Sequence, residues 1–348
     1  MSRRWKFAII VLLLIPVLVL AAGTEVNTGC RSGQVALRAD SGLDSSGSSK
    51  TPAKVRPLTD RKFQETPERL ARGRYLVNGI GECFACHGPW DSSAPAWPPI
   101  RGKEGSGFAF SWWVAPNLTP DRETGAGAWT DDMLARAIRE GVAHDGHLLD
   151  PTIMPYEFYR SMSDEDLASI IVYLRSLPPI PNALPLMRTR KDMIAPYAIP
   201  IYAQVPQPDV STPQKRGAYL VQLGSCQWCH TLRDENCVPL PGLEFAGGDL
   251  PESPFATVSS ANLTPDPSGI SYYDEAQFLK TMHTGKVGAR KISPTMPWWF
   301  FGQMNDDDLK AIFAYLRTVK PVHHRVDNTE PVAYCRICKH KHHGGALN

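Results

Sequence analysis

The sequence GRYLVNGIGECFACH (residues 73–87) returns later in the chain as GAYLVQLGSCQWCH (residues 217–230). Each segment runs from a short stretch of helix-forming residues into a C-x-x-C-H motif. The motif residues are Cys83, Cys86 and His87 in the first copy and Cys226, Cys229 and His230 in the second. Thiols three positions apart lie on one side of a helical turn, and a histidine follows directly. This spacing is the attachment pattern of c-type haem.

The same motif has a plainer interpretation, a zinc or redox C-x-x-C pair with an incidental histidine. Two copies in register, each following a short helix, favour haem attachment. The thiols would bind the two vinyl groups of one haem, and the histidine would be the proximal ligand of its iron. We therefore expect two covalently bound haem c groups, with His87 and His230 as iron ligands.

Further landmarks repeat in the same order along the chain. APNLTPD, which ends at Asp121, matches SANLTPD, which ends at Asp266, and MSDEDLASIIVYLRSLPPI matches MNDDDLKAIFAYLRTVKPV. The first cysteines of the two motifs are 143 residues apart, and Asn117 and Asn262 are 145 residues apart. Self-similarity at a fixed period indicates two copies of one domain.

Each copy has the pattern of a small all-α domain. Ser163 and Asn305 are N-cap residues followed by runs of acids, which face the positive end of the helix dipole. The apolar stripe Leu167, Ile170, Ile171, Leu174 has helical spacing, and Pro178 ends the helix. The other expected helices are Glu68–Asn78, Thr130–Glu140, Gln214–Leu223 and Asp274–Thr284.

The sixth iron ligand must come from elsewhere in each copy. Met154 and Met296 stand in similar proline-containing loops, PTIMPYEF and SPTMPWWF. A thioether is a soft ligand that raises the haem potential, and we predict these two as distal ligands. The alternative is that they fill the core, the role expected of Met133, Met162, Met282 and Met304. His144 or His147 could also ligate the first iron, but the second copy lacks an equivalent.

The remaining segments predict an exported protein with flexible joints. Arg3, Arg4 and Lys6 precede an uncharged apolar run over residues 7–22, typical of a cleaved signal peptide or a membrane anchor. Lipidation at Cys30 is a third alternative. The predicted divisions are a signal or anchor at 1–25, a flexible linker at 26–65, a domain at 66–180, a Pro-rich connector at 181–210, a second domain at 211–322 and a Cys/His-rich tail at 323–348.

The tail contains a third, defective motif. Cys335 and Cys338 have the C-x-x-C spacing, but Lys339 occupies the place of the histidine. The short segment from residue 331 to the end has no room for a haem pocket, so we expect no haem there. A disulfide, or a zinc site with His340, His342 or His343, needs less structure.

Composition is consistent with two domains and excludes one class of function. The 348 residues suffice for two cores. Lys and Arg (37) nearly balance Asp and Glu (35), whereas a nucleic-acid-binding protein carries a basic excess. We expect no nucleic-acid partner.

The two motifs, the M-P loops and the NLTPD segments give both copies a resemblance to class I cytochrome c domains. The tandem pair resembles the cytochrome c subunits of bacterial membrane-associated alcohol and sugar dehydrogenases, although it has two motifs where tri-haem members have three. The resemblance implies that the first and last helices pack together, with Gly73 near Tyr173 and Gly217 near Tyr315. The resemblance also implies that Asn117 and Asn262 lie near the haem edge. The alternative for both residues is simple turn formation.

These features predict an exported, periplasm-facing cytochrome that relays single electrons. The donor would be a dehydrogenase or a quinol-oxidising complex, the acceptor another redox protein, and the N-terminus could attach the chain to the membrane. Iron with histidine below and methionine above has no open position for substrate. The alternative is a di-haem enzyme of the peroxidase or thiosulfate dehydrogenase type, in which one axial ligand is displaceable.

Overall fold

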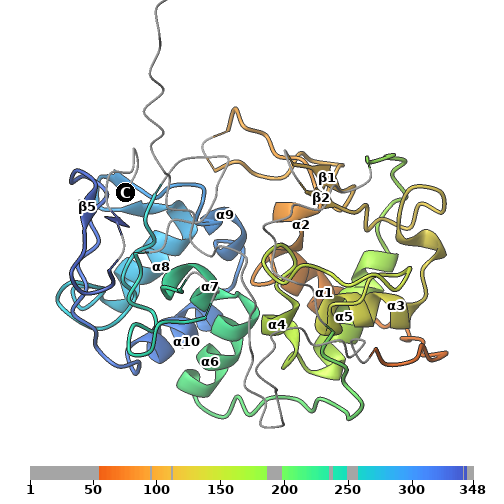
Figure 1. The fold of residues 1–348 in the computed structure, drawn as a ribbon. Coiled ribbons are helices and arrows are strands. Elements are labelled where there is room, and N and C mark those ends of the chain that lie inside the picture. The colour runs from red at the N-terminus through yellow and green to blue at the C-terminus, as the bar shows by residue number, and fades with distance from the viewer. Residues whose placement is uncertain are drawn as a thin grey trace, which may run out of the picture.

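The computed structural model describes residues 55–94, 96–110, 113–185, 198–234, 238–248, 258–339 and 341–342. The first copy contains α1 (Pro67–Asn78), α2 (Cys83–Cys86), the 3-10 helix η1 (Ala126–Ala128), α3 (Asp131–Glu140), α4 (Tyr156–Tyr159) and α5 (Asp164–Arg175). The second contains α6 (Pro213–Leu223), α7 (Cys226–His230), α8 (Glu275–Thr284), α9 (Trp298–Phe301) and α10 (Asp306–Leu316). Figure 1 shows the two groups of helices on opposite sides of the molecule. The predicted all-α fold is confirmed.

The strands in the described residues are two-residue pieces that form three antiparallel pairs. They close loops, and Ala115 is buried whereas Phe108, Val114 and Val287 are half-buried. The pairs are β1 (Phe108–Ala109) with β2 (Val114–Ala115), β3 (Lys286–Val287) with β4 (Arg290–Lys291), and β5 (Ala333–Tyr334) with β6 (Lys341–His342).

Side-chain caps mark the starts of the first and last helices of each copy, and those at Ser163 and Asn305 were expected from the sequence. Thr66 and Thr212 accept hydrogen bonds from the third backbone amide of α1 and α6, and each helix has proline in its first turn. Ser163 and Asn305 cap α5 and α10 in the same way. The helices α2, α4, α7 and α9, of four or five residues each, were not expected, because so short a segment carries no periodicity.

The first and last helices of each copy pack against one another, as the resemblance implied. A Cβ on Gly73 of α1 would lie 1.9 Å from the carbonyl oxygen of Ser169 and 2.7 Å from Cβ of Tyr173 in α5. Gly217 of α6 would approach Ala311 and Tyr315 of α10 at 1.9 and 2.8 Å. Only glycine permits this separation, so α1 packs on α5 and α6 on α10 backbone to backbone.

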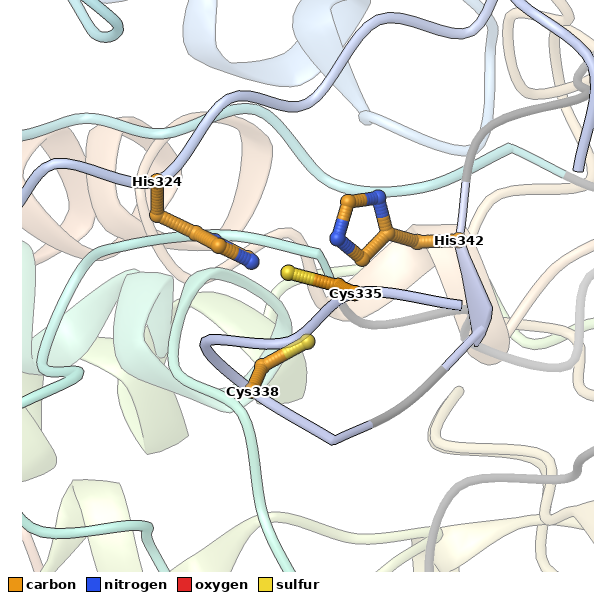
Figure 2. A group of neighbouring side chains, drawn as sticks. All are labelled: His324, Cys335, Cys338 and His342. Carbon is orange, nitrogen blue, oxygen red and sulfur yellow. The ribbon is translucent and has the colours of Figure 1, made fainter. Parts of the chain in front are cut away.

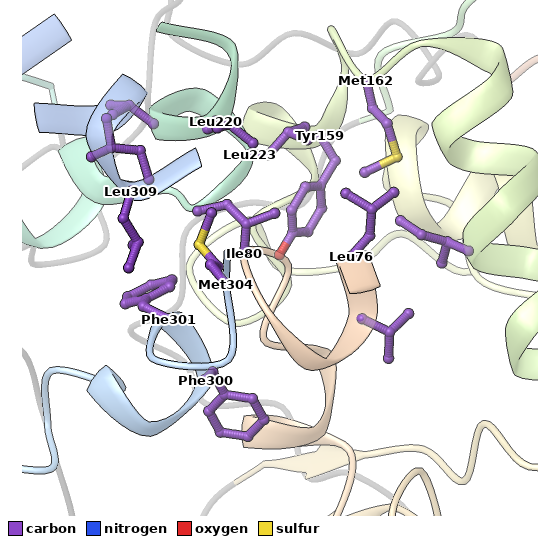
Figure 3. Close-up of a cluster of buried hydrophobic side chains, with 14 of the residues drawn as sticks. Leu76, Ile80, Tyr159, Met162, Leu220, Leu223, Phe300, Phe301, Met304 and Leu309 are labelled. Carbon is purple, nitrogen blue, oxygen red and sulfur yellow. The ribbon is translucent and has the colours of Figure 1, made fainter. Parts of the chain in front are cut away.

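The two copies share one buried apolar core. The cluster in Figure 3 contains Leu76 and Tyr159 from the first copy together with Leu220, Phe301 and Leu309 from the second. Three of the four methionines expected to fill the core are buried: Met162, Met282 and Met304. Met133 is instead half-buried, and its sulfur accepts a hydrogen bond from the amide of Thr130 at the start of α3.

Residues 55–65, which the sequence assigns to the flexible linker, lie against α3. Arg56 is 7% exposed. Its guanidinium donates to Asp132 at 2.8 Å and to Glu140 at 2.9 Å. The amide of Phe63 donates to Asp131 at 2.9 Å. These hydrogen bonds attach residues 56–63 to the first copy, a long-range contact that sequence composition does not indicate.

The Pro-rich connector follows the surface of the first copy where it is described, at residues 181–185 and 198–210. The amide of Ile199 donates to the carbonyl of Glu140 at 3.1 Å, and the amide of Asp164 donates to the carbonyl of Val205 at 2.9 Å. Backbone hydrogen bonds thus attach the connector, while Tyr202 on it is 70% exposed.

Within the described ranges, none of the helices has the length and apolar character required to cross a bilayer. The predicted signal or anchor at 1–25 and Cys30 lie outside the described residues.

Candidate haem sites and the junction between them

Both C-x-x-C-H motifs form one helical turn that leaves the first helix of their copy at a sharp bend. The residue before the first cysteine is left-handed in each, Glu82 with φ 40° and Ser225 with φ 51°. This bend separates α2 from α1 and α7 from α6. Among the described cysteines, no disulfide joins Cys83 to Cys86 or Cys226 to Cys229. Each pair lies on one turn, as covalent attachment to a single haem requires.

Burial keeps these thiols in the neutral form. It raises the pKa of Cys83 and Cys86, and also that of Cys226, to about 12. Neutral thiols are the form that forms thioethers by addition of S–H across a vinyl group. The spacing of two thiols on one turn with a histidine directly after them is the pattern of haem attachment.

The predicted proximal histidines are held by the same contact in both copies. Nδ1 of His87 lies 2.8 Å from the carbonyl oxygen of Pro116, and Nδ1 of His230 lies 2.7 Å from that of Ala261. A carbonyl can only accept, so Nδ1 carries the proton and Nε2 carries the lone pair that a metal needs. Burial lowers the pKa of both histidines, which also favours the neutral ligand form.

The carbonyls that orient these histidines lie in the NLTPD loops. Oδ1 of Asn117 accepts from the amide and hydroxyl of Thr119 at 3.0 and 2.7 Å. Asn262 accepts from Thr264 at 2.9 and 2.8 Å. The turn-forming role of both asparagines is confirmed, whereas their place at a haem edge stays a prediction. Sequence reasoning missed Pro116 and Ala261, although their position directly before Asn in both copies was a usable signal.

The methionine loops are anchored to the end of the middle helix by an aromatic ring. A Cβ on Gly141, which ends α3, would lie 2.5 Å from the ring of Tyr156, two residues after Met154. In the second copy Gly285 ends α8 and would meet the ring of Trp298 at 2.3 Å. Both methionines are partly buried and pack against the core, each in a loop of the same shape.

The histidines considered as alternatives lie on the surface. His144 and His147 are exposed. The ring of His144 stacks on Trp129 with centroids 4.3 Å apart, and Nδ1 of His147 is 2.6 Å from Asp145. An iron ligand must be shielded with its haem, so this placement favours Met154 over both.

The two attachment turns meet where the copies join. Gly224 lies just before α7, and Ile80 lies just before α2. A Cβ on Gly224 would lie 2.7 Å from Cδ1 of Ile80. Burial raises the pKa of Glu82 to about 8, and this carboxyl acts electrostatically on Cys226 of the other copy. The ring of Phe158 contacts that of Trp228 inside the second motif, with centroids 6.3 Å apart.

Two tyrosines, missed by sequence reasoning, cross this junction reciprocally. Tyr75 of α1 donates to Asp308 of α10 at 2.5 Å, and Tyr219 of α6 donates to Asp166 of α5 at 2.8 Å. Each aspartate also accepts from an arginine of its own copy, Arg72 for Asp166 and Arg216 for Asp308. These residues hold equivalent positions in the two repeats, so the contact has approximate two-fold symmetry. It fixes how one attachment turn faces the other.

The residues present therefore fit two haem groups: paired thiols, a histidine of fixed tautomer and a partly buried methionine in each copy. A further polar atom fits the second group. Nε1 of Trp298 is buried without a hydrogen-bond partner among the described residues. An indole N–H there would suit an acceptor such as a haem propionate.

Comparison with known proteins finds c-type cytochromes, although no family model matches the chain. A di-haem cytochrome c of Cereibacter sphaeroides is 29% identical over 252 residues, which are 70% of this chain and 83% of that protein. The cytochrome subunit of fructose dehydrogenase from Gluconobacter japonicus is 27% identical over 277 residues, 72% of this chain and 52% of that protein.

The cytochrome c subunit of a quinone alcohol dehydrogenase from Gluconacetobacter polyoxogenes is 39% identical over 123 residues, 34% of this chain and 25% of that protein. The chain thus spans only a quarter to a half of the length of these two dehydrogenase subunits. By these relationships the chain resembles di-haem cytochromes c and the cytochrome subunits of dehydrogenases, which supports two haem c groups as its cofactors and electron transfer as its role.

Proposed function

We propose that the chain is an exported relay that takes single electrons from a dehydrogenase and passes them through two six-coordinate haems to a downstream acceptor. The observation that carries this proposal is the duplicated proximal arrangement, in which a loop carbonyl fixes the tautomer of His87 and His230 at 2.8 and 2.7 Å. Haem iron supplies the one-electron chemistry, and the protein residues set its ligands and surroundings.

In this proposal His87 and Met154 are the axial ligands of the first iron, and His230 and Met296 those of the second. Cys83 and Cys86 form the thioethers of one haem, Cys226 and Cys229 those of the other. Burial of the methionine loops against the core supports the assignment. An iron filled on both sides must lose a ligand before it can bind substrate, whereas electron transfer needs no open position.

The meeting of the two attachment turns supports electron passage between the haems within one chain. Ile80 and Gly224 contact one another, and Phe158 contacts Trp228. Groups attached on adjoining turns are brought close without any movement of the copies. The domain limits at 66–180 and 211–322 belong to the same proposal, with a shared core between them.

Export and a dehydrogenase partner rest on sequence. The basic residues before an apolar run at residues 7–22 support export to the periplasmic side. The similarity to cytochrome subunits of fructose and alcohol dehydrogenases supports a dehydrogenase as the donor. The intact mass of the purified chain would distinguish a cleaved signal, a retained anchor and a lipid on Cys30.

The ligand assignment is tested with Met154→Ala and Met296→Ala. Each should remove the methionine-to-iron charge-transfer absorption of one haem and lower its potential, because the thioether stabilises ferrous iron. Met133→Ala is the matched control and should retain both bands. If the double variant kept both bands, another residue would be the ligand.

The relay is tested by adding carbon monoxide to the reduced protein and hydrogen peroxide to the oxidised protein. We expect slow, weak binding and no steady turnover. Rapid stoichiometric binding of carbon monoxide at one haem, or turnover of peroxide, would overturn the relay in favour of a di-haem enzyme.

A further inference from the structure

The tail gathers four metal-ligating side chains that the haem sites do not use. Ligand atoms of His324, Cys335, Cys338 and His342 all lie within 4.8 Å of one another. Figure 2 shows the four side chains converging from three separate pieces of chain. His324 and His342 are 0 and 1% exposed, and Cys338 is 2% exposed. Such a group is placed by the fold, not by chance proximity on a surface.

The donor set and its spacing match one metal. Two thiolates and two imidazoles around one centre form the tetrahedral arrangement of structural zinc, with bonds of about 2.0–2.3 Å. Donors at that radius stand roughly 3.3–3.8 Å apart, so the observed group needs only a small contraction. The strands β5 and β6 pair antiparallel and bracket the C-x-x-C turn, which brings His342 back over the two cysteines.

His324 is oriented like a ligand before any metal binds. Its Nδ1 lies 2.9 Å from the carbonyl of Ala246, so Nδ1 carries the proton and Nε2 carries the lone pair. Its backbone amide donates to Ser268 at 2.9 Å, and its carbonyl accepts from Asn262 at 3.1 Å. A Cβ on Gly248, whose φ is +94°, would lie 2.6 Å from the His324 ring.

The geometry disfavours the other uses of the tail cysteines. No disulfide joins Cys335 to Cys338 in the structure. A third haem would have to enter a space in which two imidazoles already face the thiols within 4.8 Å. Lys339, at the position of a proximal histidine, is exposed and has φ +61°.

We propose that His324, Cys335, Cys338 and His342 bind one structural zinc ion that attaches the tail to the second copy. The site is closed, with four protein ligands, so the ion has a structural role. It also lies near the loop that orients His230. Asn262, which donates to the carbonyl of His324, shapes the loop whose Ala261 carbonyl holds His230.

The first measurement is the metal content of the purified full-length holoprotein, grown with added zinc sulfate and freed of loosely bound metal. We expect one zinc with two irons per chain. Zinc well below one per chain in the wild type would overturn the proposal. So would a third iron, or loss of two mass units from a Cys335–Cys338 disulfide.

The second measurement uses neighbouring histidines as a matched pair. His324→Ala should lose the zinc, whereas His323→Ala should keep it, because His323 is exposed and lies 3.3 Å from Asp266. If His324→Ala fails to fold, the Cys335→Ser/Cys338→Ser double variant replaces it and should lose zinc but retain two haems by pyridine haemochrome. Full zinc in that double variant, or equal zinc in both histidine variants, would overturn the assignment.

Discussion

Replacing Gly73 by alanine tests the closest helix contact in the first copy. The added Cβ would lie 1.9 Å from the carbonyl oxygen of Ser169, whereas ordinary contact begins at 3.4 Å. The obstructing atom belongs to the backbone of α5, so no change of side-chain rotamer relieves the overlap. The helices α1 and α5 must instead separate by more than about 1 Å, which loosens a close-packed interface.

Two effects of opposite sign compete in this variant. Alanine is a better helix former than glycine by about 1 kcal/mol, which by itself would stabilise α1. Overpacking costs about 1–3 kcal/mol and more when backbone must shift. We take the upper end of that range and expect a net loss of about 2 kcal/mol. At about 2–4 °C per kcal/mol, the melting temperature should fall by about 4–8 °C.

The assay is thermal unfolding of the oxidised holoprotein by far-UV circular dichroism, at equal haem content. Ala71→Gly is the control, since Ala71 is exposed on the same helix and reports the helix propensity alone. Gly217→Ala should behave like Gly73→Ala, because its Cβ would lie 1.9 Å from the carbonyl of Ala311. A Gly73→Ala protein that melted at or above the wild-type temperature would refute the packing argument.

Two further predictions concern polar contacts. Tyr75→Phe removes the hydroxyl that donates to the buried Asp308, and should lower the free energy of unfolding by about 1–3 kcal/mol; an unchanged urea midpoint would contradict the junction. The hydrogen bond with Asp306 raises the pKa of His283. The stabilisation that the His283–Asp306 pair gives the folded protein is present below about pH 6.5, the pKa of histidine in the unfolded chain. It is lost as pH rises through the higher pKa of His283 in the folded protein. Wild type should therefore lose more stability than Asp306→Asn between about pH 6 and 8, and equal pH slopes in urea unfolding would rule the pair out.

Most of the helical architecture could be predicted from features that are local in the sequence. The starts of α5 and α10 follow from an N-cap at Ser163 or Asn305 and acids in the first turn, and the buried face of each helix follows from its apolar stripe. All of these features act within a few residues. The C-x-x-C-H motifs likewise indicate haem c from the sequence alone, because the two thiols and the histidine are close together along the chain. The repeat then extends each inference from one copy to the other.

Long-range contacts were decided by the tertiary structure. Arg56 reaches Asp132 and Glu140 across about 80 positions of sequence, and Tyr75 reaches Asp308 across 233. The sequence alone determined two haem-binding helical repeats and a tail that could bind zinc or form a disulfide. Only the fold brought His324 to Cys335, Cys338 and His342. A metal site depends on where side chains meet in space, and no local pattern at His324 indicates the strand pair that packs against it.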